Sequence, residues 1–321
     1  MNMHIRPIAK GASTFIPGLR QVLPKKGTGG TISAKYCYEV WLKHLVILWE
    51  NRLRSIPNTL AELGPGDSLG IGLAAMCSGV NNYYALDVVK YSNSDFNIKI
   101  FDELVALFQA RAARPAKGWP DYDNYLDENL FPSHILTNDV LNASLSRERI
   151  ALIRNALLNP ESSGEGITIK YVVPWSEDNV IEKETVDLII SHAVLEHVID
   201  LKSTYRALYL WLKPGGIMSH QIDFTSHGLS ERWNGYRAYP ELLWKVIMGK
   251  RPFLINRQPY SVHMDLLKNN GFKIICSLKS YSTEEGIQRS QLSAYWKNIS
   301  DDDLTCSGAF IEAQKPEKNP K

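Results

Sequence analysis

The sequence predicts an α/β fold in which a mostly parallel sheet carries helices on both faces. From residue 59 onward, apolar segments of strand length alternate with segments of helical periodicity. This alternation is typical of parallel strands joined by right-handed crossover helices. A glycine-rich turn directly follows the first of these strands. The segment 186–191 is apolar along nearly its whole length, as a strand buried on both faces should be.

The individual elements follow from periodicity and from their ending signals. Strands are expected at 59–63, 83–86, 167–173, 186–191 and 217–224, and helices at 69–77, 98–111 and 201–212. The last of these helices stops at Lys213-Pro214-Gly215-Gly216, a helix-ending pattern. The segment 272–313 adds two strands with a helical piece between them, which brings the expected sheet to seven strands.

Residues outside this alternation divide into an N-terminal part and two inserts. Residues 1–57 are expected to form an irregular arm, over 1–33, followed by a helix over 34–54 that covers the side of the sheet; residues 58–321 form the main domain. Inserts at about 112–166 and 225–261 interrupt the rhythm. Loops of this length are usually functional or carry structure of their own, and we expect the second insert to be a substrate lid.

Composition limits the class of protein. The chain has 321 residues, 44% of them hydrophobic, enough for one large core. A formal net charge of +2 gives no electrostatic reason to expect nucleic acid as a partner. The four scattered cysteines and the lack of a long apolar segment predict a cytoplasmic protein. Peripheral membrane contact through 241–255 stays open, and the oligomeric state is not predicted.

The strongest functional signal is the glycine turn together with an acid on the next strand. The turn reads Glu62-Leu63-Gly64-Pro65-Gly66, and Asp87 ends the second strand about twenty residues later. Glycines let the backbone turn tightly and approach a ligand without an intervening Cβ. An acid at that position can accept both hydroxyls of a ribose. The combination predicts a nucleoside-type ligand.

The turn does not suit a dinucleotide. Leu69 stands where a dinucleotide-binding turn has its third glycine, and Asp67 would place a carboxylate near the phosphates. S-adenosylmethionine has no phosphate and carries a sulfonium and an ammonium group. Nearby carboxylates such as Glu62 are compatible with that ligand.

Four segments resemble, in order, the motifs of the class I S-adenosylmethionine-dependent methyltransferases. Residues 61–70 resemble the first motif, and Asp87 matches the acid of the second strand. Residues 186–198 resemble the fourth-strand motif, and 212–216 resemble the turn before the fifth strand. The resemblance covers about residues 58–224 and implies a Rossmann-like fold, methyltransferase activity and S-adenosylmethionine as cofactor.

The same resemblance assigns roles to individual residues. It implies that Glu62, Gly64 and Gly66 surround the methionine part of the cofactor and that Asp87 binds the ribose. Val173, together with Val172 and Trp175, is expected beside the adenine, and His192 lies at the ligand edge after the fourth strand. Many relatives end the third strand with an acid for the adenine amino group, and this chain has none there.

Candidate catalytic residues lie at or beyond the end of the fifth strand. His220, Asp223 and His227 should face the same edge as the glycine turn. Histidine is the commonest general base near neutral pH. We therefore hypothesise O-methylation, with His227 or His220 as base and Asp223 orienting it. The spacing of His192 and His197 matches no zinc motif, so no metal is expected.

The acceptor is predicted from the second insert, whose aromatic and arginine side chains suit a sugar, a glycan or a phosphorylated small molecule. These side chains are Arg232, Trp233, Tyr236, Arg237, Tyr239 and Trp244. The region also resembles, more loosely, methyltransferases of bacterial polysaccharide biosynthesis. Two alternatives stay open: a non-catalytic nucleoside-binding regulatory domain and an NAD-dependent oxidoreductase.

Overall fold

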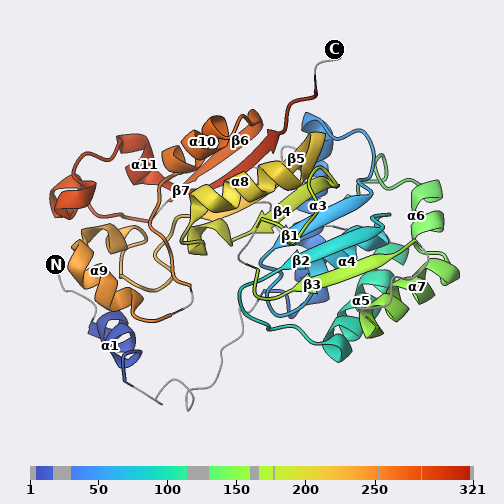
Figure 1. The fold of residues 1–321 in the computed structure, drawn as a ribbon, viewed down its shortest axis with the longest axis horizontal. Helices are drawn as coiled ribbons and strands as arrows, with labels where there is room; N and C mark the ends of the chain where they lie inside the picture. Colours follow the sequence, from blue (N-terminus) through green and yellow to red (C-terminus); the bar gives the residue numbers. More distant parts are fainter. Residues whose placement is uncertain are drawn as a thin grey trace.

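The centre of the molecule is a seven-stranded sheet with the strand order β3-β2-β1-β4-β5-β7-β6 (Figure 1). The computed structural model describes residues 5–16, 30–113, 130–159, 166–175, 178–251, 253–282 and 284–318. Neighbouring strands from β3 to β5 pair in parallel, whereas β7 runs antiparallel to both β5 and β6. The strands are β1 (Thr59–Leu63), β2 (Asn82–Leu86), β3 (Thr168–Val172), β4 (Val186–His192), β5 (Leu212–Asp223), β6 (Lys273–Tyr281) and β7 (Cys306–Gln314). The predicted seven-stranded, mostly parallel sheet is confirmed.

The register of the parallel strands brings their carboxyl ends to one edge. Leu63 pairs with Leu86 on one side and with Ser191 on the other, and Ser191 pairs in turn with His220. The loops that follow β1, β2, β4 and β5 therefore leave the sheet next to one another. Ligands of open α/β sheets bind at this edge.

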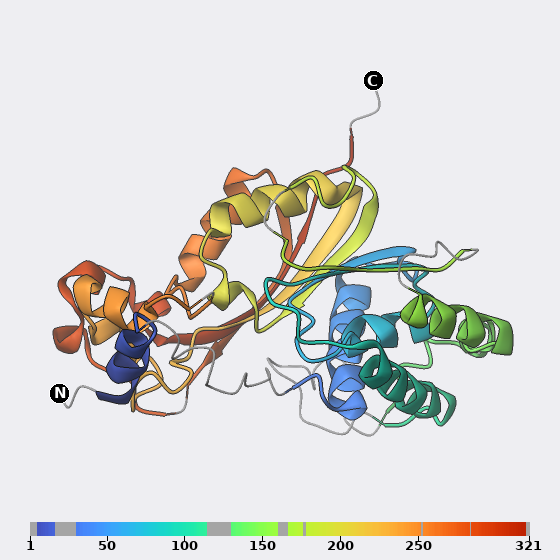
Figure 2. The ribbon, with the colours of Figure 1, turned by 60° about the horizontal axis from the view of Figure 1, so that its bottom comes forward.

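Helices cover both faces of the sheet, as Figure 2 shows. One face carries α3 (Ala34–Asn51), α4 (Gly70–Cys77) and α5 (Ser94–Gln109), with α6 (Asn138–Ser144) and α7 (Arg147–Leu158) beside them; the other carries α8 (Leu201–Trp211) and α10 (Tyr260–Asn269). Each group packs its buried side chains against the strands in one continuous apolar cluster. Side chains of Ser33, Asn93 and Asp200 cap α3, α5 and α8 by accepting a backbone N–H of the first turn.

The N-terminal arm differs from the prediction, because Ile5–Ser13 form the helix α1. This helix packs against α9 (Glu241–Met248) so closely that a Cβ on Gly11 would lie 2.0 Å from the carbonyl oxygen of Val246. A helix this short depends on tertiary packing, which local sequence patterns do not reveal. Residues 17–29 of the predicted arm, and 114–129 and 160–165 of the first insert, lie outside the described residues.

The second insert contributes to a separate lobe beyond the end of β5. Its elements are η3 (Gly235–Ala238) and α9, and they meet η4 (Arg289–Gln291), η5 (Ala294–Trp296) and α11 (Asp301–Thr305) from the connection between β6 and β7. Figure 1 shows this lobe beside the sheet, together with α1.

The aromatic and arginine side chains expected to contact the acceptor mostly build the core of this lobe. Tyr236, Arg237 and Tyr239 are buried. The guanidinium of Arg237 lies 5.4 Å from the ring of Tyr236 and 5.8 Å from that of Trp296, and its Nη1 donates to the carbonyl of Asp303 at 2.7 Å. The prediction was wrong for these residues, because stacked aromatic and guanidinium groups give the same sequence pattern inside a core as on a binding surface.

Candidate functional site

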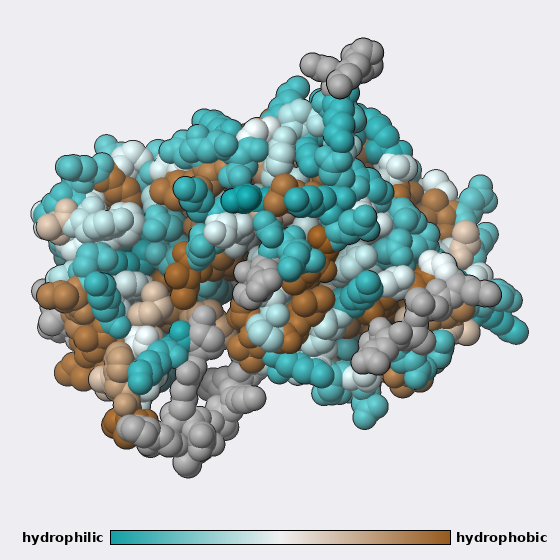
Figure 3. All heavy atoms as spheres, in the orientation of Figure 1, coloured by the Kyte–Doolittle hydropathy of each residue, from teal (hydrophilic) through white to brown (hydrophobic). Residues whose placement is uncertain are grey.

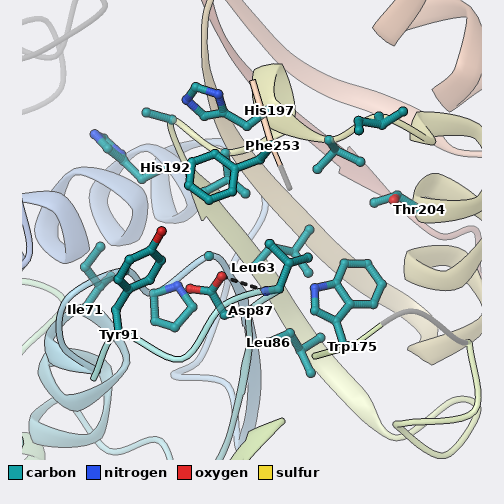
Figure 4. Close-up of a pocket in the computed structure, with 18 of the residues that line it drawn as sticks. Leu63, Ile71, Leu86, Asp87, Tyr91, Trp175, His192, His197, Thr204 and Phe253 are labelled. Carbon is teal, nitrogen blue, oxygen red and sulfur yellow. Dashed lines mark hydrogen bonds between the residues drawn. The ribbon is translucent and has the colours of Figure 1, made fainter. Parts of the chain in front are cut away.

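A cavity of about 890 Å³ lies at the carboxyl ends of β1, β2 and β4. Figure 4 shows Asp87 between Tyr91 and Trp175, with His192, His197 and Phe253 on another wall of the cavity. Its volume falls in the range of about 300–1,000 Å³ that is usual for small-molecule sites. The backbone of the predicted glycine turn, through Gly64 and Gly66, also lines it.

The turn after β1 requires its glycines. Gly64 and Gly66 have φ values of +63° and +76°, in the left-handed region that side chains disfavour. A Cβ on Gly64 would also lie 2.6 Å from Cγ2 of Val194, in the loop after β4. The Gly64 N–H donates to the carbonyl of Leu86 at 2.8 Å, so the turn is fixed against β2.

Asp87 occupies the position expected of a ribose-binding acid. Its Oδ1 accepts the backbone N–H groups of Val88 at 2.7 Å and Val89 at 3.3 Å. Burial raises the pKa of Asp87 above its ordinary value, and these hydrogen bonds, with that of the Gly66 N–H, act in the opposite direction. The carboxylate is thus held in one orientation at the cavity wall.

Glu62 lies behind the turn and not on the cavity wall. Its Oε2 accepts the Gly72 N–H at 3.1 Å and the hydroxyl of Tyr83. Burial raises the pKa of Glu62 to about 7. The side chain of Glu62 therefore connects β1, α4 and β2 through its hydrogen bonds. Its predicted direct contact with the cofactor would require it to turn away from these partners.

The adenine side of the cavity differs in part from the prediction. Trp175 lines the cavity, and its backbone N–H donates to the carbonyl of Asp87 at 3.1 Å. Val173 is not among the lining residues. Asp178, which sequence reasoning missed, lines the same region. Its signal is its position three residues after Trp175, in the loop that follows the third strand.

The segment before α3 and the first turn of α3 also reach the cavity, which the sequence did not indicate. Gly30, Thr31 and Tyr36 line it. The Ser68 N–H donates to Oγ1 of Thr31 at 3.2 Å, which joins this segment to the turn after β1. Nothing in the local sequence marks this contact, because its partners are 37 residues apart.

His192 lines the cavity at the end of β4, as the sequence predicts. Its Nδ1 lies 3.4 Å from Nε2 of His44, whose Nδ1 is hydrogen-bonded to Oγ of Ser219 at 2.7 Å. Burial lowers the pKa of His192 to about 3, so the imidazole is neutral at physiological pH. A neutral ring is compatible with a neighbouring sulfonium.

The two candidate bases have different surroundings. His220 is buried, is hydrogen-bonded through Nδ1 to Oγ of Ser191 at 2.8 Å, and does not line the cavity. His227 lines the cavity, and its Nε2 lies 3.5 Å from Oδ2 of Asp223. Asp223 itself accepts the Thr225 N–H at 2.8 Å, which fixes it beside the ring. Of the two, the structure brings only His227 to the cavity.

A cluster that the sequence did not reveal surrounds His227. Oε1 of Glu196 lies 4.0 Å from Nε2 of His227, and the rings of His197 and His227 are 5.0 Å apart between centroids. Burial raises the pKa of Glu196 well above its usual range and lowers that of His197 to about 4. The available signal was the adjacent pair Glu196-His197, and its partner comes thirty residues later, after β5.

His227 also lines a second cavity of about 580 Å³. Basic residues line this space from two distant segments: Arg6 and Lys10 from α1, and Arg251 from just beyond α9. Glu231 lines it as well. One imidazole therefore stands at the wall of both cavities, the first built by the sheet edge and the second by the lobe.

The surface over α1 and α9 is apolar in part, as Figure 3 shows. Ile5 and Leu242 are 77% and 79% exposed. Within the described ranges, we find no helix that combines the length and hydrophobicity needed to cross a membrane. Peripheral membrane contact through α9 stays a prediction.

Comparison with known proteins supports the reading of the motifs. Residues 128–219 match a family described as a methyltransferase domain. The tRNA 5-carboxymethoxyuridine methyltransferase of Escherichia coli K12 is 33% identical over 93 residues, which are 29% of this chain and 34% of that protein. The chain thus spans about a third of the length of the curated relatives it matches.

Solved structures with similar folds have low sequence identity. An S-adenosylmethionine-dependent methyltransferase of Methanosarcina mazei is 14% identical, with a TM-score of 0.43 over 85% of this chain and 98% of that one. Phosphoethanolamine N-methyltransferase 2 of Haemonchus contortus, in complex with S-adenosylmethionine, is also 14% identical, with a TM-score of 0.43 over 88% of this chain and 57% of that one.

Residues 128–219 therefore match a methyltransferase domain, and they contribute to a sheet of Rossmann-like topology.

Proposed function

We propose that the protein transfers the methyl group of S-adenosylmethionine to a hydroxyl oxygen of a small, negatively charged acceptor, a sugar or a glycan. The observation that carries this proposal is the position of His227 between the two cavities. The cofactor occupies the larger cavity, and the acceptor approaches His227 from the smaller one. Glycan assembly in the cytoplasm is the setting that this chemistry fits.

The residues of the larger cavity fit the cofactor. Gly64 and Gly66 present backbone without a Cβ, Asp87 presents an oriented carboxylate for the ribose, and Leu86 and Trp175 provide apolar surface for the adenine. When bound, the sulfonium supplies an activated methyl group. The chain then has to hold the acceptor in line with that methyl and exclude water.

His227 is the proposed general base. Its Nε2 faces Asp223 at 3.5 Å and Glu196 at 4.0 Å, so an Nε2–H would be oriented by carboxylates and Nδ1 would be left to accept the proton of the acceptor. This is the arrangement by which carboxylates fix the tautomer of catalytic histidines. A positioned base typically contributes about 10²–10⁴-fold to the rate.

The lining of the smaller cavity supports an anionic acceptor. Arg6, Lys10 and Arg251 place three cationic residues in this lining beside His227, and the guanidinium of Arg251 also donates to the carbonyls of Ile247 and Met248 at the end of α9. Guanidinium groups bind phosphate and carboxylate through paired hydrogen bonds. Glu231 adds a carboxylate that can accept hydrogen bonds from sugar hydroxyls.

A labelled-methyl assay tests this proposal. The acceptors are phosphorylated sugars, nucleotide sugars, sugar acids, their uncharged counterparts and tRNA, which the name of the E. coli relative suggests. We expect label in anionic sugars and little in the uncharged ones. Label in tRNA alone would replace the acceptor class, and label in none would favour the silent nucleoside-binding domain.

Calorimetry on the same preparation separates the cofactor from the acceptor. We expect binding of S-adenosylmethionine and S-adenosylhomocysteine and none of NAD. Binding of NAD alone would favour the oxidoreductase and overturn the proposed reaction.

A further inference from the structure

We propose that Glu196, His197 and His227 form a binding site for a divalent transition-metal cation such as Zn²⁺, and that its occupation stops methyl transfer. The binding site follows from the geometry of these three residues. The inhibitory effect rests on the proposed function, because it assumes that His227 is the base.

The geometry brings one ligand atom from each residue to a common point. These three atoms all lie within 4.8 Å of one another. Zn²⁺ binds imidazole nitrogen and carboxylate oxygen at about 2.0–2.2 Å, so the ligands must move inward by about an ångström or less. The side chain of His227 is 28% exposed and has room for this movement, whereas Glu196 is fixed in a short helix, η2 (Leu195–His197).

Glu196 is the observation that points to a ligand. The residue is 3% exposed; the backbone N–H groups of Glu196 and Asp223 lower its pKa, yet within the described ranges neither carboxylate oxygen makes a hydrogen bond of ordinary geometry. Nδ1 of the neighbouring His197 is also buried without a hydrogen-bond partner among the described residues. Buried polar atoms are nearly always partnered, and an orphaned group calls for an explanation such as an ion. One cation in the cluster would satisfy both residues together.

The donor set selects the kind of metal. Mg²⁺ and Ca²⁺ require mostly oxygen ligands, and this cluster offers a single carboxylate with two imidazoles. Such a set suits Zn²⁺, Co²⁺ and Ni²⁺. Oδ2 of Asp223 lies 3.5 Å from Nε2 of His227, on the side of the ring that faces Glu196, and adds a second negative charge that favours a cation there.

Occupation of the site removes the base. A neutral imidazole that coordinates a cation through one nitrogen carries its hydrogen on the other. His227 then has no lone pair with which to accept the proton of an acceptor hydroxyl. Cation binding and methyl transfer therefore exclude each other at this residue.

Cobalt binding tests the site directly. The full-length chain, stripped with a chelator, is titrated with Co²⁺ without cofactor or acceptor, and the visible absorption of the bound ion is followed. We expect one Co²⁺ per chain, displaced by Zn²⁺. Glu196→Gln and His227→Asn should each weaken binding by more than about tenfold, since even losing an outer partner of a ligand typically costs about 10–100-fold.

Two choices keep the test interpretable. His227→Asn changes a partly exposed side chain whose φ of +47° asparagine tolerates, so the variant should fold even if Glu196→Gln does not. The matched control is His134→Asn, which changes a half-exposed histidine paired with Glu50 outside the cluster. Absent cobalt binding, or binding equal in the wild type and in both cluster variants, would overturn the site.

The inhibitory effect has its own readout. Zn²⁺ should abolish methyl transfer by the wild-type enzyme, a chelator should restore it, and the residual activity of His227→Asn should not respond. If Zn²⁺ binds but turnover is unchanged, the inhibitory role is wrong. Because cobalt binding is measured without cofactor or acceptor, a failed acceptor assay would contradict the proposed function and leave the metal site standing.

Discussion

Two regions of the cavity wall hold buried carboxylates in opposite ways. At the end of β2, Asp87 accepts backbone N–H groups of the residues that follow it. Beyond β4, Glu196 is also buried; the backbone N–H groups of Glu196 and Asp223 lower its pKa, yet neither of its oxygens has a hydrogen bond of ordinary geometry in the described part of the chain. The first region is complete as it stands, because its hydrogen bonds already fix the carboxylate.

The second region needs something more to satisfy it. Glu196, His197 and His227 face one another without completing each other's hydrogen bonds. Unsatisfied buried groups persist where function requires them. We therefore distinguish two sides of the cavity. On the preformed side, the carboxylate of Asp87 is already fixed by hydrogen bonds. On the reactive side, around His227, buried polar groups lack ordinary hydrogen bonds and can take up a proton, an acceptor or an ion.

The largest effect should come from breaking the reactive side. His227→Asn is expected to lower kcat by about 10²–10⁴-fold, the usual contribution of a positioned base. S-adenosylmethionine affinity, measured by calorimetry, should change little, since the preformed side is untouched. His134→Asn serves as the control. A variant with nearly full single-turnover rates would show that His227 is not the base.

Breaking the preformed side should give the complementary result. Under the proposed function, Asp87 accepts two hydrogen bonds from the ribose, each worth about 1.5–3 kcal/mol as bonds to a charged group, so S-adenosylmethionine affinity should fall by about 100-fold or more in Asp87→Ala. Calorimetry measures this loss. Asp265→Asn, at an exposed position on α10, is the control. Unchanged affinity in Asp87→Ala would mean that the cofactor lies elsewhere.

A third buried carboxylate tests whether an acid without an ordinary hydrogen bond must have a functional role. Glu312 on β7 is buried, lines neither cavity, and has no ordinary hydrogen bond to its carboxylate among the described residues. Burial raises its pKa to about 8, opposed by the side chain of Asn51. In the folded state it therefore holds a proton that the unfolded state loses above its ordinary pKa, and stability falls as pH rises through that window.

The substitution Glu312→Gln should remove this pH dependence. At pH 9 the variant should be more stable than the wild type, by on the order of 3 kcal/mol, because the amide never ionises. The difference should shrink toward pH 5, where both side chains are neutral when folded. Chemical denaturation at a series of pH values measures it, with methyl transfer unchanged. A constant difference across pH would contradict the assignment.

The sequence predicted the preformed side far better than the reactive one. Gly64, Gly66 and Asp87 lie within thirty residues and belong to one strand-turn-helix-strand unit. Their spacing in the sequence therefore predicts how they are arranged in space. His192 was placed correctly for the same reason, since it ends a strand. These predictions rest on the parallel sheet, which sets the ligand edge once the strands are identified.

The rest depends on contacts that spacing does not encode. Glu196 and His227 come from different loops, and Thr31 meets Ser68 across the fold. Glu62 has the expected position in the chain, but its side chain turns toward Tyr83 and Gly72. Tertiary packing decided each case. The buried stacking of Arg237 shows how one residue pattern serves two opposite environments.

The smallest expected effect is a loss of stability on substitution of Gly64, in the turn on the preformed side. Gly64→Ala places a Cβ at a φ of +63° and 2.6 Å from Val194, so both backbone strain and a side-chain clash oppose it. Left-handed backbone alone costs a non-glycine residue about 1–2 kcal/mol. Gly166→Ala has a φ of +81° with no atom within 4 Å of the new Cβ, and so isolates that cost. In urea denaturation, Gly64→Ala should lose more stability than Gly166→Ala, and adding Val194→Ala should recover the excess. Equal losses of stability in the two glycine variants would contradict a close contact between the turn and the loop after β4. The two sides of the cavity would then be less tightly packed against each other than the structure shows.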